Sequence, residues 1–215
     1  MTVTDSPPAT DSAHVRRRPT QARSQKRFDQ VLDAASALIA THGLDPISMT
    51  DIAEEAGMAL TALYRYFPNK RAIVRELALM TLEADAALNT EVVDDASQSP
   101  AERIKAGVLA YCHHLNDPMR LQIRAAIHAD AELSDLDLAD SRRNAAVIAA
   151  AVDYDGLGVG RLELERRALL LVELFDGVAR LASRVDESEA DVVLNTFAEM
   201  ASWTILRPEP FKEIS

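Results

Sequence analysis

Hydrogen-bonding and aromatic side chains are concentrated in the stretch from Ile47 to Arg71, ISMTDIAEEAGMALTALYRYFPNKR. The stretch predicts two short helices joined by a tight turn at Gly57, followed at once by the capped start of a third helix. Such an arrangement presents one helix to the major groove of DNA. Its Thr, Tyr, Arg and Lys side chains supply donors that base edges and phosphate oxygens accept. The chemistry that this stretch can perform is recognition of DNA.

A second group, His113, His114 and Asp117, has the residue types of a metal site. Adjacent residues on a helix diverge by about 100°, so the two imidazoles cannot easily share one ion. We therefore expect no metal. His114 lies nearer the apolar face of its helix and could give one hydrogen bond to a ligand. The role of His128 is similarly open.

The sequence carries none of the motifs G-x-S-x-G, P-loop, G-x-G-x-x-G after a strand, or H-E-x-x-H. The Gly-rich segment from Gly156 to Gly160 has no preceding strand, so it predicts a loop. We expect neither an enzyme nor a bound cofactor.

Length and composition favour a helical intracellular protein. The 215 residues are enough for one large domain or for a small and a medium one. Long Ala, Leu, Val, Arg and Glu stretches with only 7 Gly favour helix over sheet. The single cysteine, Cys112, excludes an intramolecular disulfide and suits a reducing compartment. No apolar run has transmembrane length and the N-terminus lacks signal-peptide features, so we expect a cytoplasmic protein without membrane association.

The net charge of −11 is unevenly distributed along the chain. Residues 1–75 hold ten Lys and Arg against eight Asp and Glu, whereas the remainder holds thirteen against twenty-six. Within the first part, six bases fall in the twelve residues from Arg16 to Arg27. Local patches rather than net charge set the affinity for phosphate, so these bases could form an arm that contacts DNA, or a soluble tail.

Apolar periodicity and capping signals predict helices throughout the chain after a disordered start over residues 1–20. Ser48 with Asp51 fits a capping box that opens the second helix, and Asn69 is a good N-cap for the fourth. Two further helices begin at Ser99 and Asp117. The other predicted helices cover about 25–42, 59–66, 69–94, 132–152, 161–184 and 187–206. The sequence predicts an all-α fold of about nine helices.

The segment VLDAASALIATHGLDPISMTDIAEEAGMALTALYRYFPNKRAIV contains a first helix ending in Gly, then I-A-x-x-A-G, then L-Y-x-Y-F-x-N-K. Over about Lys26–Leu77 the chain resembles the TetR family of bacterial transcriptional regulators. The resemblance implies a helix-turn-helix head over 23–70 and an effector-binding body over 71–215 that dimerises through its last two long helices. Composition and charge predict a disordered basic arm over residues 1–22.

The resemblance also implies which side chains face DNA: Thr50, Leu60, Thr61, Tyr64, Arg65, Tyr66 and Lys70. Thr61 and Arg65 are expected at base edges, and the Thr50, tyrosine and lysine side chains at phosphates. Two positions depart from the family pattern. Ala59 stands where a capping Ser is common, and Leu60 stands where a polar residue is common, so Leu60 can touch a thymine methyl but cannot hydrogen-bond a base.

The body is expected to enclose a ligand pocket, since the family binds effectors there. The inward-facing candidates are Met80, Tyr111, Cys112, Leu115, Ile123, Ile127 and Phe175. Residues of these types at helical spacing also serve as plain core, and that alternative stays open.

The apolar run from Ala168 to Ala182 favours a subunit interface together with a core. A homodimer is expected to form a four-helix bundle across a two-fold axis, with an intrachain core as the alternative. The candidate interface residues are Leu170, Leu174, Val178, Ala182, Val193, Phe197 and Met200.

These features favour a repressor that binds a palindromic double-stranded operator and is released by a small apolar or aromatic effector. One alternative is an all-helical carrier or enzyme with an incidental helix-turn-helix. Another is an activator, because the sign of regulation depends on operator position.

Overall fold

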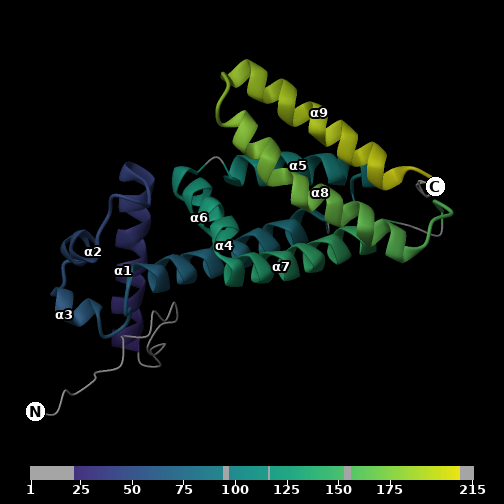
Figure 1. Ribbon diagram of the computed structural model, residues 1–215. Coiled ribbons are helices and arrows are strands. Elements are labelled where there is room, and N and C mark those ends of the chain that lie inside the picture. The colour runs from purple at the N-terminus through teal and green to yellow at the C-terminus, as the bar shows by residue number, and fades with distance from the viewer. Residues whose placement is uncertain (1–21, 94–96, 116, 153–155, 209–215) are drawn as a thin grey trace, which may run out of the picture. The chain divides into compact units, whose positions relative to one another are not determined.

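The computed structural model describes residues 22–93, 97–115, 117–152 and 156–208, with the side chains of residues 88–93 and 112–115 outside the description (Figure 1). All regular elements in these residues are helices, which confirms the all-α prediction. They are α1 (Ala22–His42), α2 (Met49–Glu55), α3 (Leu60–Leu63), α4 (Lys70–Val93), α5 (Pro100–Leu115), α6 (Pro118–Ala129), α7 (Ala131–Ala150), α8 (Arg161–Ala182) and α9 (Glu187–Leu206).

The chain divides into two compact units, Met1–Leu77 and Ala78–Ser215, which we call the head and the body. The division falls inside α4 and not between residues 70 and 71, where the sequence placed it. The first turns of α4 pack in the head because Ala72, Ile73 and Leu77 are buried there. One continuous helix therefore contributes residues to both units.

Local signals in the sequence set the helix ends of the head. Gly43 ends α1 with φ 82°, a left-handed conformation that glycine adopts at little cost, and its N–H donates to the Ile39 carbonyl. Ser48 and Asp51 form the predicted capping box at the start of α2. Gly57, with φ 62°, makes the turn between α2 and α3. These three features were predicted correctly.

The third helix is shorter than predicted. The α-helix covers only Leu60–Leu63, and the backbone then continues in tighter turns: Arg65 N–H donates to the Ala62 carbonyl and Tyr66 N–H to the Leu63 carbonyl. Ala59 at the N-cap makes no side-chain capping bond, as its type predicted. Without a cap, α3 depends on burial of Leu63 and of Phe67 just beyond it to hold its position.

An apolar core fixes the helices of the head to one another. The Phe28 ring on α1 stacks on the Phe67 ring with centroids 4.7 Å apart. Ile52 on α2 and Leu63 on α3 are fully enclosed beside them. Complete burial of an aliphatic or aromatic side chain of this size stabilises a fold by about 1.5–3 kcal/mol. The head can therefore hold a one-turn helix rigidly.

The body is a layered helical bundle in which α5 packs on α9, α7 on α8, and α8 on α9 (Figure 1). Its core joins the rings of Tyr111, Phe175 and Phe197 in successive edge-to-face contacts. The buried Arg167 guanidinium on α8 donates to carbonyls at the end of α9, including that of Arg207 at 2.6 Å. A cation at a helix C-terminus satisfies carbonyls that the helix itself leaves open. None of the described helices is long and apolar enough to cross a membrane.

Candidate nucleic-acid interface and ligand cavity

The surface of α3 and the turn that follows it carries three of the predicted contact residues on the outside of the head. Thr61 and Arg65 are exposed, and the Tyr64 side chain is 38% exposed. Leu63, between them in sequence, is fully buried and anchors the element. Thr61 lies on α3 itself and Arg65 on the turn that follows it. This arrangement leaves their donors available to an external partner.

Thr50 lies on the first turn of α2 and is exposed. Leu60, at the start of α3, is half-buried, so part of its side chain is shared with the head core. Both residues remain candidates for DNA contact, with Leu60 restricted to apolar contact.

Tyr66 has a partner that the sequence did not indicate. Its hydroxyl lies 3.1 Å from the Ser24 Oγ on the first turn of α1, and its ring meets the edge of Phe28. Tyr66 therefore ties the turn after α3 to α1. Any phosphate contact by this hydroxyl has to be shared with Ser24.

Lys70, predicted to contact phosphate, has hydrogen-bond partners within the head. Its ammonium donates to the carbonyls of Leu44, Asp45 and Ile47 at 3.0–3.1 Å. An ammonium has three donors, so these carbonyls use all of them. Lys70 thus clamps the loop between α1 and α2. The sequence missed this role because the three acceptors are backbone atoms more than twenty residues away.

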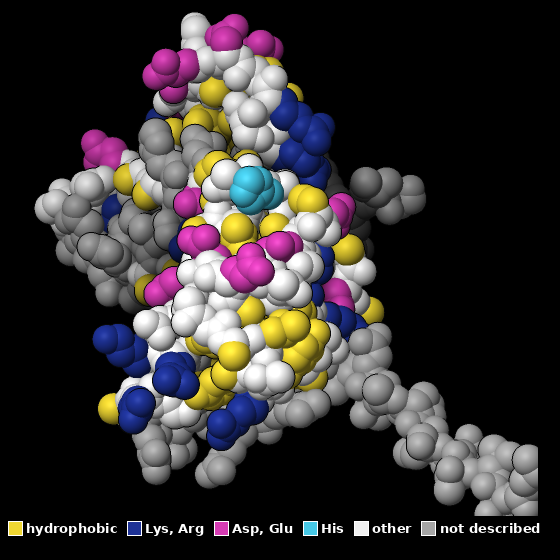
Figure 2. Space-filling model, turned by 90° about the vertical axis from the view of Figure 1, so that its left-hand side faces the viewer, with side chains coloured by type: hydrophobic (Ala, Val, Ile, Leu, Met, Phe, Trp, Pro, Cys, Tyr) yellow, Lys and Arg dark blue, Asp and Glu magenta, His cyan; other side chains and the backbone are white. Residues whose placement is uncertain are grey.

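Basic side chains from α1 add to the exposed positive charge of the head. Arg23, Lys26 and Arg27 are exposed on the first turns of α1. Figure 2 shows Lys and Arg side chains gathered at the lower end of its view, around hydrophobic ones, with a separate band of Asp and Glu above them. Arg16, Arg17 and Arg18, the rest of the predicted arm, lie outside the described residues. Clustered cations of this kind favour phosphate oxygens.

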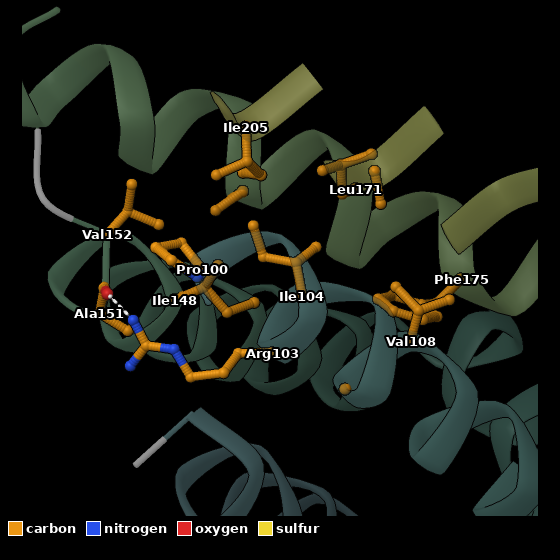
Figure 3. A pocket seen from close by; sticks show the side chains of 13 residues that line it. Pro100, Arg103, Ile104, Val108, Ile148, Ala151, Val152, Leu171, Phe175 and Ile205 are labelled. Carbon is orange, nitrogen blue, oxygen red and sulfur yellow. Dashed lines mark hydrogen bonds between the residues drawn. The ribbon is translucent and has the colours of Figure 1, made fainter. Parts of the chain in front are cut away.

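The body contains a narrow apolar cavity of about 50 Å³ between α5, α7, α8 and α9 (Figure 3). Ile104 and Val108 on α5 face Leu171 and Phe175 on α8 across it. Arg103 carries the only charge among the described lining residues, and its Nη2 donates to the Ala151 carbonyl at 2.9 Å. The lining suits an apolar molecule.

Most of the predicted pocket residues lie elsewhere. Phe175 lines the cavity, and Tyr111 contacts Phe175 with ring centroids 4.8 Å apart but is not in the lining. Ile123 and Ile127 are fully buried core residues of α6, and Met80 is 51% exposed, so none of the three lines this cavity. The side chains of Cys112 and Leu115 lie outside the described residues. Helical spacing identifies a buried face but does not reveal which buried residues border a void.

A network of buried charges links four helices of the body. Asp85 on α4 accepts from Arg120 on α6 at 3.1 Å and from the Tyr111 hydroxyl at 3.3 Å. Arg124, one turn further along α6, pairs with Asp137 on α7 at 2.8 Å and with Asp176 on α8 at 2.9 Å. Each buried charge thus has an opposite partner, as burial requires.

Burial dominates the electrostatics of this network. It raises the pKa of Asp85 to about 6, although Arg124 and Arg120 oppose the shift. Burial also raises the pKa of Asp137, again against the pull of Arg124. Sequence reasoning missed these residues, yet a signal was present: Arg120, Arg124 and His128 recur at four-residue spacing on α6. Such spacing places all three on one face of the helix.

The outer face of α8 and α9 exposes large apolar side chains. Leu170, Leu174 and Met200 of the predicted dimer interface are about half exposed. Val178 and Val193 are half-buried. Phe197 and Ala182, the other two predicted interface residues, are buried in the core of their own chain. The sequence missed four exposed apolar residues on these helices, Leu162, Leu181, Val192 and Trp203.

Two family models match the chain. Residues 31–77 match "Bacterial regulatory proteins, tetR family", and residues 98–206 match "Tetracyclin repressor-like, C-terminal domain". The chain is 36% identical over 52 residues to the HTH-type transcriptional regulator YvdT of Bacillus subtilis, covering 24% of this chain and 27% of that one. It is 29% identical over 85 residues to the HTH-type transcriptional repressor KstR2 of Mycolicibacterium smegmatis, covering 40% and 41%. The matches span less than half of either relative.

Solved structures share the fold over most of the chain. A transcriptional regulator from Cytophaga hutchinsonii superposes with a TM-score of 0.66 at 18% identity, covering 83% of this chain and 96% of the other. The TetR family regulator PfmR from Thermus thermophilus gives a TM-score of 0.61 at 19% identity, covering 80% and 96%. These likenesses establish the arrangement of helices and leave the ligand open.

Proposed function

We propose a function for this chain, which belongs to the TetR family of bacterial transcriptional regulators. It is a homodimeric repressor that a small effector releases from a palindromic operator. The observation that carries the DNA-binding part is the exposure of Thr61 and Arg65 on an element anchored by buried Leu63. Arginine reads guanine O6 and N7 with two parallel hydrogen bonds. Exposed bases on the first turns of α1 supply phosphate contacts beside it.

The outer face of α8 and α9 supports the dimer. Leu170, Leu174 and Leu181 on α8 and Val192, Met200 and Trp203 on α9 repeat at helical spacing and are exposed in the single chain. A contiguous apolar face of this kind marks an interaction site, and a two-fold axis brings the same face of two copies together. In such a dimer the two recognition elements read half-sites about 34–36 Å apart.

The apolar cavity supports an apolar or aromatic effector. Its present volume of about 50 Å³ is well below the roughly 300–1,000 Å³ typical of small-molecule sites. An effector that occupies it must therefore widen the gap between α5 and α8. An effector shifts the protein between states only by binding one of them better, so a widened body is the state that it selects.

The DNA-binding part is tested by fluorescence anisotropy with the DNA upstream of the gene. Arg65→Ala should weaken specific binding by about tenfold to a hundredfold, because a bidentate arginine contact is worth about 1–3 kcal/mol. Arg142→Ala, an exposed arginine on α7 in the body, is the matched control and should bind as the wild type does. Equal affinities for wild type and Arg65→Ala would exclude Arg65 from the interface.

The dimer is tested by sedimentation velocity at micromolar concentration. The wild type should sediment as a dimer, and Leu174→Glu should sediment as a monomer, because two carboxylates would be buried across the axis. A monomeric wild type would contradict the proposal for this face.

A further inference from the structure

A second cavity, of about 240 Å³, lies between α6 and α8 in the body. Its lining differs from that of the apolar cavity: it is rich in polar side chains and includes Arg124 and His128 on α6 and Asp176 and Arg180 on α8, with Arg184 just beyond α8. The proposed function makes no use of this cavity.

Two of the arginines in this lining carry charge that the protein does not offset. Arg124 forms ion pairs with Asp137 and Asp176. The Asp176 carboxylate also lies 2.6 Å from His128 Nε2. Arg180 and Arg184 are exposed, and neither side chain forms an ion pair or hydrogen bond within the described residues. The cavity therefore holds one carboxylate against three guanidinium groups.

We propose that this cavity binds a small organic anion through a carboxylate or phosphate group, held by Arg180 and Arg184. Guanidinium groups present forked donors that match the oxygens of such groups, and hydrogen bonds between opposite charges are about twice as strong as neutral ones. The site is separate from the apolar cavity and takes a ligand of the opposite chemistry.

The anion would also compete with Asp176 for the donors at the base of the cavity. Arg124 gives Asp176 hydrogen bonds from Nε and Nη2 at 3.0–3.2 Å, and its Nη1 lies 4.0 Å from Asp85 on α4. A ligand that draws Arg124 toward the cavity changes the charge facing α4.

The test is isothermal titration of the full chain with inorganic phosphate and, separately, with acetate, both at ionic strength fixed with chloride. We expect saturable binding of at least one of the two anions, which also identifies the preferred group. The double variant Arg180→Gln/Arg184→Gln should lose about tenfold or more in affinity for it. Arg166→Gln, which removes an exposed arginine of α8 outside the cavity, should leave the affinity unchanged.

Both single variants, Arg180→Gln and Arg184→Gln, accompany the double variant. Their side chains are exposed, so each should fold and sediment as the wild type does. The proposal is overturned if neither anion binds beyond the chloride background, or if the double variant binds as tightly as the wild type.

Discussion

The head and the body differ in where the polar side chains of their candidate functional regions lie. In the head, Thr61 and Arg65 lie outside an apolar core and meet solvent. In the body, Asp85, Arg124 and Asp137 are buried and paired with one another or with neighbouring side chains. Exposed donors on a rigid support suit a large polyanion that docks from outside. Buried ion pairs in the body join α6 to α7 and α8.

The largest effect is expected where the buried network of the body is broken. Arg124→Met leaves the carboxylates of Asp137 and Asp176 without their main partner, and we expect a loss of about 3–5 kcal/mol in the free energy of unfolding. The exposed Arg142→Met should change it by less than about 0.5 kcal/mol. Urea unfolding measures both. Similar values for the two variants would show that the network does not stabilise the body.

A pH dependence should follow from the buried carboxyl of the same network. The pKa of Asp85 is raised from 3.8 to about 6, so the folded state holds this proton more tightly than the unfolded chain does. The stability that the folded state gains from this tighter proton binding is fully present below pH 3.8. It is lost as pH rises through about 6. Asp85→Asn removes this loss.

The free energy of unfolding of Asp85→Asn should therefore increase relative to wild type as pH rises from 4 to 7, by at most about 3 kcal/mol. Urea unfolding at four or five pH values provides the comparison, with the exposed Asp135→Asn as control. Parallel pH profiles for wild type and Asp85→Asn would contradict the raised pKa.

A substitution of Lys70 in the head tests whether its ammonium stabilises the loop between α1 and α2 or contacts DNA. Lys70→Met removes three hydrogen bonds to the loop between α1 and α2, and we expect a loss of about 1–3 kcal/mol in the free energy of unfolding. Lys26→Met, at an exposed position on α1, should change stability little. If Lys70→Met keeps its stability but loses affinity for DNA, the clamp assignment is wrong and the phosphate contact is correct.

The smallest effect concerns the uncapped start of α3. Ala59 has the extended backbone of an N-cap but no side-chain acceptor, so Ala59→Ser should stabilise the head by about 0.5–1 kcal/mol. The same change at the exposed mid-helix position Ala37 should destabilise it slightly. The two shifts in urea midpoint should have opposite signs. Equal signs would mean that capping does not limit α3.

Local signals in the sequence were sufficient for the fold. Ser48 with Asp51, Gly43, Gly57 and Asn69 each act through a neighbour within four residues, and each performs its predicted role in the structure. Apolar periodicity likewise located the long helices of the body to within a few residues at either end.

The sites depended on partners that sequence spacing does not identify. Lys70 binds carbonyls from another part of the chain, and Tyr66 meets Ser24 across the head. Periodicity put Phe197 on an apolar face but could not tell the inner side of α9 from its outer side, where Trp203 lies. Whether a buried residue borders a cavity depends on how several helices pack together.

The most direct test of DNA recognition is a comparison of two binding isotherms for the intact protein, one with the upstream intergenic DNA and one with a shuffled sequence of equal composition. Measurements at several salt concentrations separate the phosphate contribution from base recognition. We predict a preference for the upstream DNA of about a thousandfold or more, with both affinities falling as salt rises. Equal affinities for the two DNAs at every salt concentration would contradict the account.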